Sequence, residues 1–113
     1  MLTINLEYKS GILFCRLNGN LNKATSHKLN RYLIPVIMKN GIKYLVYNLN
    51  ELETIDKVGR KALAYGNKAI VSNKGFVYLC DIPEDLKVFL KELPIQKTTN
   101  EKSALQLLAI WKR

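Results

Sequence analysis

The first part of the chain alternates hydrophobic and polar positions with the two-residue period of a β-strand. Residues 3–8 alternate in this way, and residues 12–17 form a second strand-like run. Ser10-Gly11 lies between them and suits a tight turn, so the pattern predicts a β-hairpin. We expect the Asn18-Gly19-Asn20 segment to close this hairpin.

From about Ala24 the hydrophobic positions recur with helical spacing. One face of the expected helix collects Leu29, Leu33, Val36 and Ile37. Pro35 lies inside this stretch and predicts a kink or an early end, whereas Asn40-Gly41 is a signal for the end of a helix. The short apolar run at residues 44–49 is typical of a buried central strand.

A second helix is expected to begin after Asp56, which is well placed as an N-cap. Small and apolar residues cluster on one of its sides, namely Val58, Ala62, Tyr65, Gly66 and Ala69. The opposite side carries Lys57, Arg60, Lys61, Ala64 and Lys68. Residues 73–75 should end this helix, and residues 76–80 predict another buried strand.

The last third of the chain predicts two more helices. Pro83 suits the first turn of a helix that Pro94 ends, with an apolar face of Leu86, Phe89, Leu90 and Leu93. Residues 95–98 can add a short edge strand. Thr98 and Glu101 have the spacing of a capping box ahead of a final helix that carries Ala104, Leu105 and Leu108. The element order predicts one α/β domain over residues 1–113, with a mixed sheet of about four to five strands packed against about four helices.

Composition narrows the class of protein. The 113 residues are 48% hydrophobic and 24% charged, which is typical of a globular chain. The longest charge-free run has nine residues, too few for a membrane span of about 18 or more. The N-terminus lacks the features of a secretory signal. Cys15 and Cys80 sit in apolar runs, so buried free thiols in a reducing cytoplasm are expected.

Candidate catalytic chemistry is sparse. No CxxC, HExxH, GxGxxG or GxxxxGK[ST] motif occurs, and His27 is the only histidine, in a polar segment typical of a solvent-facing helix. Glu51 and Glu53 are expected in a loop, while Glu84 and Asp85 suit the first turn of a helix. We therefore predict a protein that is not an enzyme and that uses neither a metal nor a cofactor.

One segment resembles a known family. Residues 46–59, Val-Tyr-Asn-Leu-Asn-Glu-Leu-Glu-Thr-Ile-Asp-Lys-Val-Gly, resemble the signature of the STAS domain, and more closely that of stand-alone bacterial anti-sigma factor antagonists. In these proteins a strand ends in Asn-Leu, a loop carries a spaced Leu, and Asp-Ser-Ser-Gly opens a helix. Residues 17–21 resemble the family's L-x-G-x-L, residues 75–80 its late strand, and residues 103–105 its terminal helix.

The resemblance implies a single STAS domain that works by binding in the cytoplasm. Such antagonists dock onto an anti-sigma factor, often an ATP-binding serine kinase, and so free a sigma factor for transcription. Phosphorylation within the Asp-Ser-Ser-Gly motif blocks docking, because it places about two negative charges in the interface. The implied partner-binding residues are Asn20, Thr54, Ile55, Asp56, Lys57, Val58, Gly59, Arg60 and Lys61.

This sequence departs from the motif at both serine positions. Lys57 and Val58 replace them, and neither side chain can accept a phosphate. Thr54 is the nearest hydroxyl, but it precedes the helix and is expected to be a loop residue. The phosphorylation switch is therefore expected to be absent. Asp56 and Gly59 remain, and capping and close packing would by themselves account for both.

The net charge of +9 and the pI near 9.7 favour acidic partners. The basic side of the second helix is expected to be an ordinary solvated face, a docking face for an acidic protein, or, least favoured without a nucleic-acid motif, a nucleic-acid contact. Two further functions are open: the STAS subunit of a bacterial lipid-transport ABC system, which would bind an ATPase, and a stressosome-like scaffold. We expect a monomer or a weak dimer.

Overall fold

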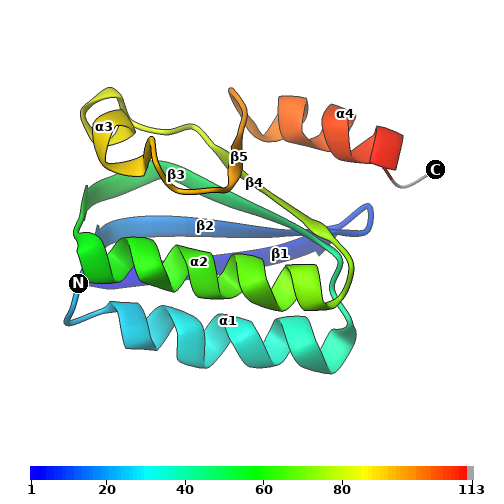
Figure 1. Ribbon diagram of the computed structural model, residues 1–113, viewed down its shortest axis with the longest axis horizontal. Coiled ribbons are helices and arrows are strands. Elements are labelled where there is room, and N and C mark those ends of the chain that lie inside the picture. The colour runs from blue at the N-terminus through cyan, green and yellow to red at the C-terminus, as the bar shows by residue number, and fades with distance from the viewer. Residues whose placement is uncertain (112–113) are drawn as a thin grey trace.

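The strands form one mixed sheet in the computed structural model, which describes residues 1–111 (Figure 1). The sheet order follows the chain: β1 (Leu2–Lys9), β2 (Ile12–Leu21), β3 (Tyr44–Ile55), β4 (Phe76–Cys80) and β5 (Gln96–Lys97). β1 and β2 are antiparallel, and every later neighbour is parallel. The predicted hairpin and the predicted mixed α/β sheet are confirmed.

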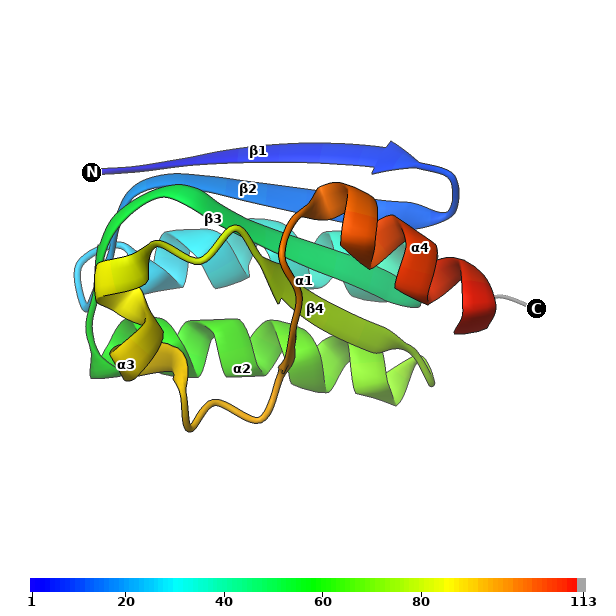
Figure 2. The ribbon, with the colours of Figure 1, turned by 90° about the horizontal axis from the view of Figure 1, so that it is seen from above.

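Helices cover both faces of this sheet (Figures 1 and 2). α1 (Ser26–Asn40) and α2 (Lys57–Ser72) lie side by side on one face, and α4 (Glu101–Trp111) lies on the other. A 3-10 turn, η1 (Glu84–Leu86), leads into the single turn of α3 (Lys87–Leu90). Because strand side chains alternate between faces, Leu13 and Cys15 pack toward α1 and α2, whereas Phe14 packs toward α4.

Of the kink or early end expected at Pro35, the early end is wrong, because α1 continues to Asn40. Pro35 lies on the exposed side, where water can bond the backbone carbonyl that its missing N–H leaves free. The predicted stop at residues 40–41 is confirmed, because Gly41 adopts a left-handed φ of 60° and its N–H bonds the Ile37 carbonyl oxygen.

β2 and β3 are both longer than predicted. Residues 18–20 do not close the hairpin; β2 runs through them to Leu21. β3 likewise continues to Ile55, so Glu51, Glu53 and Thr54 lie in a strand rather than in a loop. The two extensions pair with each other in parallel, with two shifts of register. Each stretch looks like a loop by itself, and only its partner makes it a strand.

α2 begins after Asp56 as predicted, but its buried side is rotated from the expected one. Val58 and Tyr65 are 38% and 56% exposed, whereas both were expected on the apolar face. Ala62, Gly66 and Ala69 are buried as predicted, and Gly59, Leu63 and Ile70 complete the buried side. Gly66 lies so close to the buried Tyr47 hydroxyl that a Cβ atom there would collide with it. Close contact with the sheet, rather than hydrophobicity alone, sets the rotation of this helix.

The C-terminal region differs most from the prediction. The third helix is only the 3-10 turn of η1 and the single turn of α3, with Leu86 and Leu90 buried and Phe89 47% exposed. The Thr98–Glu101 capping box does not form, because Asn100 Oδ1 accepts the Ser103 N–H at 2.8 Å instead. α4 packs through Ala104 and Leu108, as its pattern predicted.

Both cysteines are buried and free, as predicted. Burial raises the pKa of the Cys15 thiol to about 12, so it stays protonated and packs as a small apolar side chain.

Candidate functional site

Nine residues meet where β2 and β3 end and α2 begins. This β3–α2 junction consists of Asn20, Thr54, Ile55, Asp56, Lys57, Val58, Gly59, Arg60 and Lys61. The parallel pairing of β2 with β3 places Asn20 opposite Thr54, so residues far apart in the sequence share one end of the sheet. The structure thus brings together all the residues that the sequence singled out.

Asp56 is the centre of the junction. Its Oδ1 accepts the Gly59 N–H at 2.8 Å, and its Oδ2 accepts the Lys23 N–H at 3.0 Å. Its own N–H donates to the Leu21 carbonyl oxygen at 3.2 Å. The Gly59 hydrogen bond is the largest cause that lowers the pKa of the Asp56 carboxyl, because it stabilises the charged form. One carboxylate therefore caps α2 and also ties it to the segment after β2.

Gly59 is buried because the first turn of α2 passes close to β2. A Cβ atom at this position would collide with the Leu21 carbonyl oxygen and would press on the Ile55 side chain. Ile55 itself is buried in the core, with 7% exposure, and supports the junction from below. Of the predicted partner-binding residues, these two have no side-chain surface to offer a partner.

Thr54 and Asn20 join the ends of the two strands. The Thr54 hydroxyl donates to Asn20 Oδ1 at 2.6 Å, and the Asn20 carbonyl oxygen accepts the Thr25 hydroxyl at 2.6 Å. Thr54 is exposed, but its hydroxyl is engaged in a short hydrogen bond. The pair braces the junction next to Asp56.

The outer surface of the junction is basic with an apolar centre. Lys57 and Lys61 are exposed, and Val58 is 38% exposed between them. Arg60 is half-buried, because its Nη1 donates to the Phe89 carbonyl oxygen of α3 at 3.0 Å. Sequence reasoning missed this contact, since the pattern gave no indication that α3 would end beside α2. The backbone of α3 at Phe89 therefore lies beside the junction.

A shallow groove follows the exposed side of α2 from this surface. It has a volume of about 270 Å³ and is lined by Lys57, Arg60, Lys61, Ala64, Glu92, Leu93 and Pro94. Its cations come from α2 and its single carboxylate from the segment after α3.

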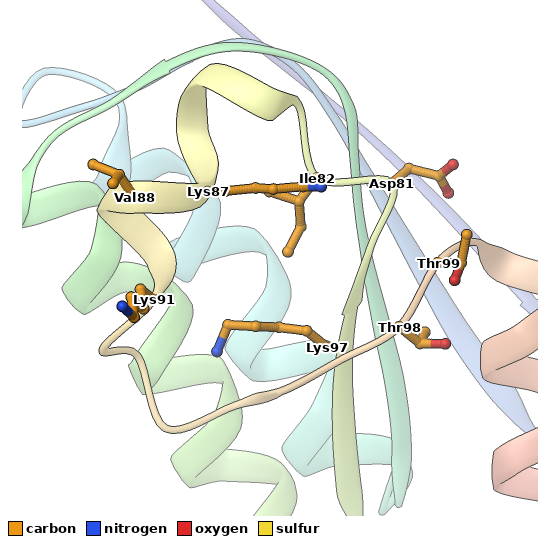
Figure 3. Close-up of a pocket in the computed structure, with 8 residues that line it drawn as sticks. All are labelled: Asp81, Ile82, Lys87, Val88, Lys91, Lys97, Thr98 and Thr99. Carbon is orange, nitrogen blue, oxygen red and sulfur yellow. The ribbon is translucent and has the colours of Figure 1, made fainter.

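A larger hollow lies elsewhere, between α3 and β5 (Figure 3). It measures about 760 Å³ and is lined by Asp81, Ile82, Lys87, Val88, Lys91, Lys97, Thr98 and Thr99. Lys87 already pairs with Glu84 at 2.9 Å, and Lys97 Nζ donates to the Leu93 and Ile95 carbonyl oxygens at 2.8 Å each. In Figure 3 the Lys97 and Thr98 side chains extend in opposite directions. Two of the three lysines are thus used to hold the local fold.

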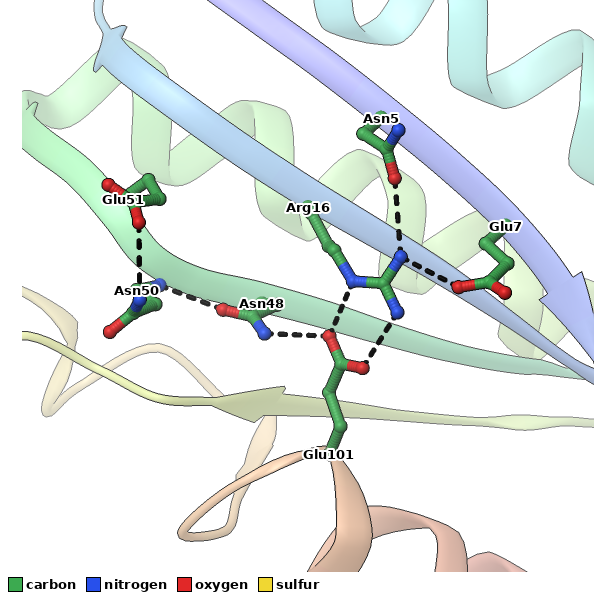
Figure 4. Close-up of polar contacts among 7 residues, drawn as sticks. All are labelled: Asn5, Glu7, Arg16, Asn48, Asn50, Glu51 and Glu101. Carbon is green, nitrogen blue, oxygen red and sulfur yellow. Dashed lines mark hydrogen bonds and ion pairs between the residues drawn. The ribbon is translucent and has the colours of Figure 1, made fainter.

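A polar network anchors α4 to the sheet (Figure 4). The Arg16 guanidinium donates to both carboxylate oxygens of Glu101 at 2.8 Å and forms an ion pair with Glu7 at 2.8 Å. Asn48 Nδ2 donates to Glu101 at 2.7 Å. The Arg16 hydrogen bonds are the main cause that lowers the pKa of Glu101. All these groups are satisfied within the network, which indicates a structural role.

Other reactive groups do not gather in the described part of the chain. No three His, Cys, Asp or Glu side chains of residues 1–111 are grouped so that they could hold a metal ion. His27 is exposed on α1, as predicted. Among the helices that the structure describes, none has the length and apolar character needed to cross a membrane.

Comparison with known proteins agrees with this architecture. A family model described as the STAS domain matches residues 3–104. The anti-sigma F factor antagonist of Paenibacillus polymyxa is 27% identical over 115 aligned residues, which cover 96% of this chain and 97% of that protein.

Two solved structures show the same fold at low identity. RsbS of Moorella thermoacetica superposes with a TM-score of 0.82 at 16% identity, covering 97% of each chain. An anti-sigma factor antagonist from Mycobacterium paratuberculosis superposes with a TM-score of 0.73 at 20% identity, covering 95% of this chain and 93% of that one. At these identities the likeness concerns the fold.

Proposed function

Because this chain belongs to the STAS domain family, we propose that it acts as an anti-sigma factor antagonist in the cytoplasm. It docks onto an anti-sigma factor of the serine-kinase type through the β3–α2 junction, and so controls transcription that depends on a sigma factor. The relative from Paenibacillus polymyxa, named an anti-sigma F factor antagonist, supports this, because the alignment extends over nearly all of both chains. Residues 1–113 act as one binding domain, without catalysis and without a cofactor.

The observation that carries the proposal is the rigid presentation of Lys57 and Val58. Asp56 fixes the first turn of α2 through two hydrogen bonds, and Gly59 lets this turn lie against β2. Lys57 and Val58, which stand where the family motif has its two serines, are therefore held outward on a preordered surface. A preordered surface loses little entropy on docking. The exposed Lys57 favours a partner with an acidic surface, because complementary charge speeds association.

The same two positions imply that docking is not switched by phosphorylation. Lys57 and Val58 offer no hydroxyl, and the Thr54 hydroxyl is engaged with Asn20. The protein is therefore competent to bind at all times, unless another input regulates it.

The test is a titration of the purified protein against the kinase-type anti-sigma factor of the same genome. Lys57→Glu places a negative charge on the docking surface, and we expect the affinity to fall by about tenfold or more. Lys74→Glu, with the same change of charge in the exposed turn after α2, is the matched control and should bind like the wild type. Equal affinity of a folded Lys57→Glu variant would overturn the docking surface.

A second variant tests the missing switch. Val58→Ser restores a hydroxyl where the motif has its second serine, and the kinase with Mg-ATP should add one phosphate to it. The wild type should keep its mass under the same conditions, as measured by intact-protein mass spectrometry. Recovery of transporter subunits instead of an anti-sigma factor in a pull-down would replace the proposal with the transport role, and elution as a large particle would point to a scaffold.

A further inference from the structure

The two helices on one face of the sheet carry only positive charge. α1 has three basic residues and α2 has four, namely Lys28, Arg31 and Lys39 with Lys57, Arg60, Lys61 and Lys68. Neither helix contains an Asp or a Glu, although the chain has nine of them. All nine lie on strands, in loops or in the C-terminal region. The charge of +9 is therefore not evenly spread, and the α1–α2 layer is its main source.

An apolar groove runs between these two helices. It has a volume of about 470 Å³, and its lining consists of Asn30, Ile34, Met38, Tyr65, Lys68, Ala69 and Ser72. Met38 is 50% exposed and Tyr65 is 56% exposed, so both large side chains present much of their surface to solvent. At one end, the Ser72 hydroxyl contacts Met38 Sδ at 3.7 Å and bridges the two helices.

The groove has the geometry that a third helix fits. α1 and α2 each connect parallel strands of the same sheet, so they run in the same direction, side by side (Figure 1). Ile34 and Met38 are four residues apart on α1, as are Tyr65 and Ala69 on α2, so each pair forms a ridge along its helix. Ridges with this spacing pack into the grooves of another helix.

Cations flank this apolar seam. Lys68 lines the groove, Lys61 lies one turn before Tyr65 on the same side of α2, and Arg31 precedes Ile34 by three residues on α1. A helix in the groove would have its apolar stripe against Met38 and Tyr65 and its two flanks beside these cations. Carboxylates on those flanks would complete the charge pattern.

We propose that the α1–α2 groove docks an acidic amphipathic helix of a partner protein. An anionic membrane is the less favoured partner, because the apolar side chains lie in a hollow between helices and do not form the apolar helix face that inserts into a bilayer. Nucleic acid is less favoured because the groove lining has one aromatic ring, that of Tyr65, among aliphatic side chains, whereas successive bases stack on several aromatic platforms. This surface shares only Lys61 with the β3–α2 junction, and the inference does not depend on the proposed function.

The experiment is an NMR titration of the full chain with a synthetic probe. The probe is a stapled helical peptide with Leu at helical spacing on one side and Glu along both flanks. A twin with Lys in place of Glu is the charge control. We expect the acidic peptide to saturate the protein and to shift the backbone signals of Ile34, Met38 and Tyr65. Its affinity should fall several-fold when the salt concentration is raised from about 50 to about 300 mM, because salt screens charges on the protein surface.

Matched variants locate the binding. Arg31→Glu with Lys68→Glu should weaken the binding of the acidic peptide by about tenfold or more, whereas Lys91→Glu with Lys102→Glu, the same change of charge at exposed positions after α3 and on α4, should not. Tyr65→Ala should also weaken it by about tenfold, and Tyr8→Ala, an exposed tyrosine at the far end of β1, should have no effect.

Four results would overturn the inference. They are equal binding of the Lys twin, shifts confined to another surface, tighter binding of the same residues to phosphatidylglycerol vesicles or to RNA, and no saturable binding up to about 1 mM peptide. Lys57→Glu should leave peptide binding intact, so failure of the junction and failure of the groove are distinguishable.

Discussion

α2 and α4 both begin just after a strand, yet their first turns are held in different ways. At α2, Asp56 caps the helix with its own carboxylate and also bonds the Lys23 N–H. At α4, Asn100 supplies the cap, and the first helical residue, Glu101, turns away to pair with Arg16 on β2. The start of α2 is set by a residue next to it in the sequence. The position of α4 depends on a partner 85 residues away.

The start of α2 is therefore available as a docking surface, whereas the start of α4 anchors that helix to the sheet. Because Asp56 caps α2, the side chains of Lys57 and Val58 are exposed and are not needed to hold the start of the helix. In the first turn of α4, the Glu101 carboxylate is engaged in the network with Arg16, Asn48 and Glu7, so it is not free to bind a partner. A docking surface is thus expected where a neighbouring residue caps the helix and the outward side chains of its first turn make no contacts that the fold needs.

The largest loss of stability is expected from Gly59→Ala, which disturbs the first turn of α2. The added Cβ would collide with the Leu21 carbonyl oxygen, so the first turn of α2 must move off β2. Alanine favours a helix by about 1 kcal/mol, but overpacking against backbone costs more, and we expect a net loss of about 2 kcal/mol. Urea unfolding followed by circular dichroism measures this loss. An unchanged midpoint would mean that the close approach does not matter.

The next effect is expected at the α4 side, from Glu101→Gln. This variant keeps one acceptor oxygen but loses the charge that pairs with Arg16, while Arg16 keeps its ion pair with Glu7. Arg16 and Glu101 are 33% and 23% exposed, so solvent screening reduces the contribution, and we expect a loss of about 1 kcal/mol. In hydrogen exchange, the backbone amides of α4 should lose protection while those of α2 keep it. Equal loss of protection in both helices would contradict the separation.

Several features of the two regions were accessible from the sequence because their causes are local. Asp56 as an N-cap and the exposure of Lys57 and Lys61 follow from residues within one turn of each other. The hairpin and the stop at Gly41 are local in the same sense.

The features that sequence reasoning missed have distant partners. β2 and β3 extend because each supplies hydrogen bonds to the other, and Ile55 is buried for the same reason. The bond from Arg60 to the Phe89 carbonyl oxygen joins residues 29 apart, and no pattern of polar and apolar positions encodes it. Glu101 has capping-box spacing from Thr98, but a guanidinium in reach offers it a stronger bond than a backbone N–H.

Asp56→Ala should produce a loss of similar or smaller size, and this loss should depend on pH. Removal of the N-cap costs about 1 kcal/mol near neutral pH. The folded pKa of Asp56 lies below the unfolded value, so its contribution is full above the unfolded pKa and is lost as the pH falls through the folded pKa. The difference between wild type and Asp56→Ala should therefore shrink on acidification. Unfolding curves at neutral pH and near the unfolded pKa of Asp test this, and a difference that grows toward acid would contradict it.

The smallest effect is expected from Thr98→Ala, and it decides which residue starts α4. If the capping box formed, loss of the Thr98 hydroxyl would cost about as much as loss of any N-cap, or about 1 kcal/mol. In the structure the Thr98 backbone N–H pairs with the Leu79 carbonyl oxygen, and Asn100 Oδ1 accepts the Ser103 N–H in the first turn of α4. We therefore expect Thr98→Ala to stay within about 0.5 kcal/mol of the wild type and Asn100→Ala to carry the full cost of the cap. Urea unfolding of the two variants measures both losses of stability. A larger loss for Thr98→Ala than for Asn100→Ala would mean that Thr98 caps α4, as the capping-box spacing predicts.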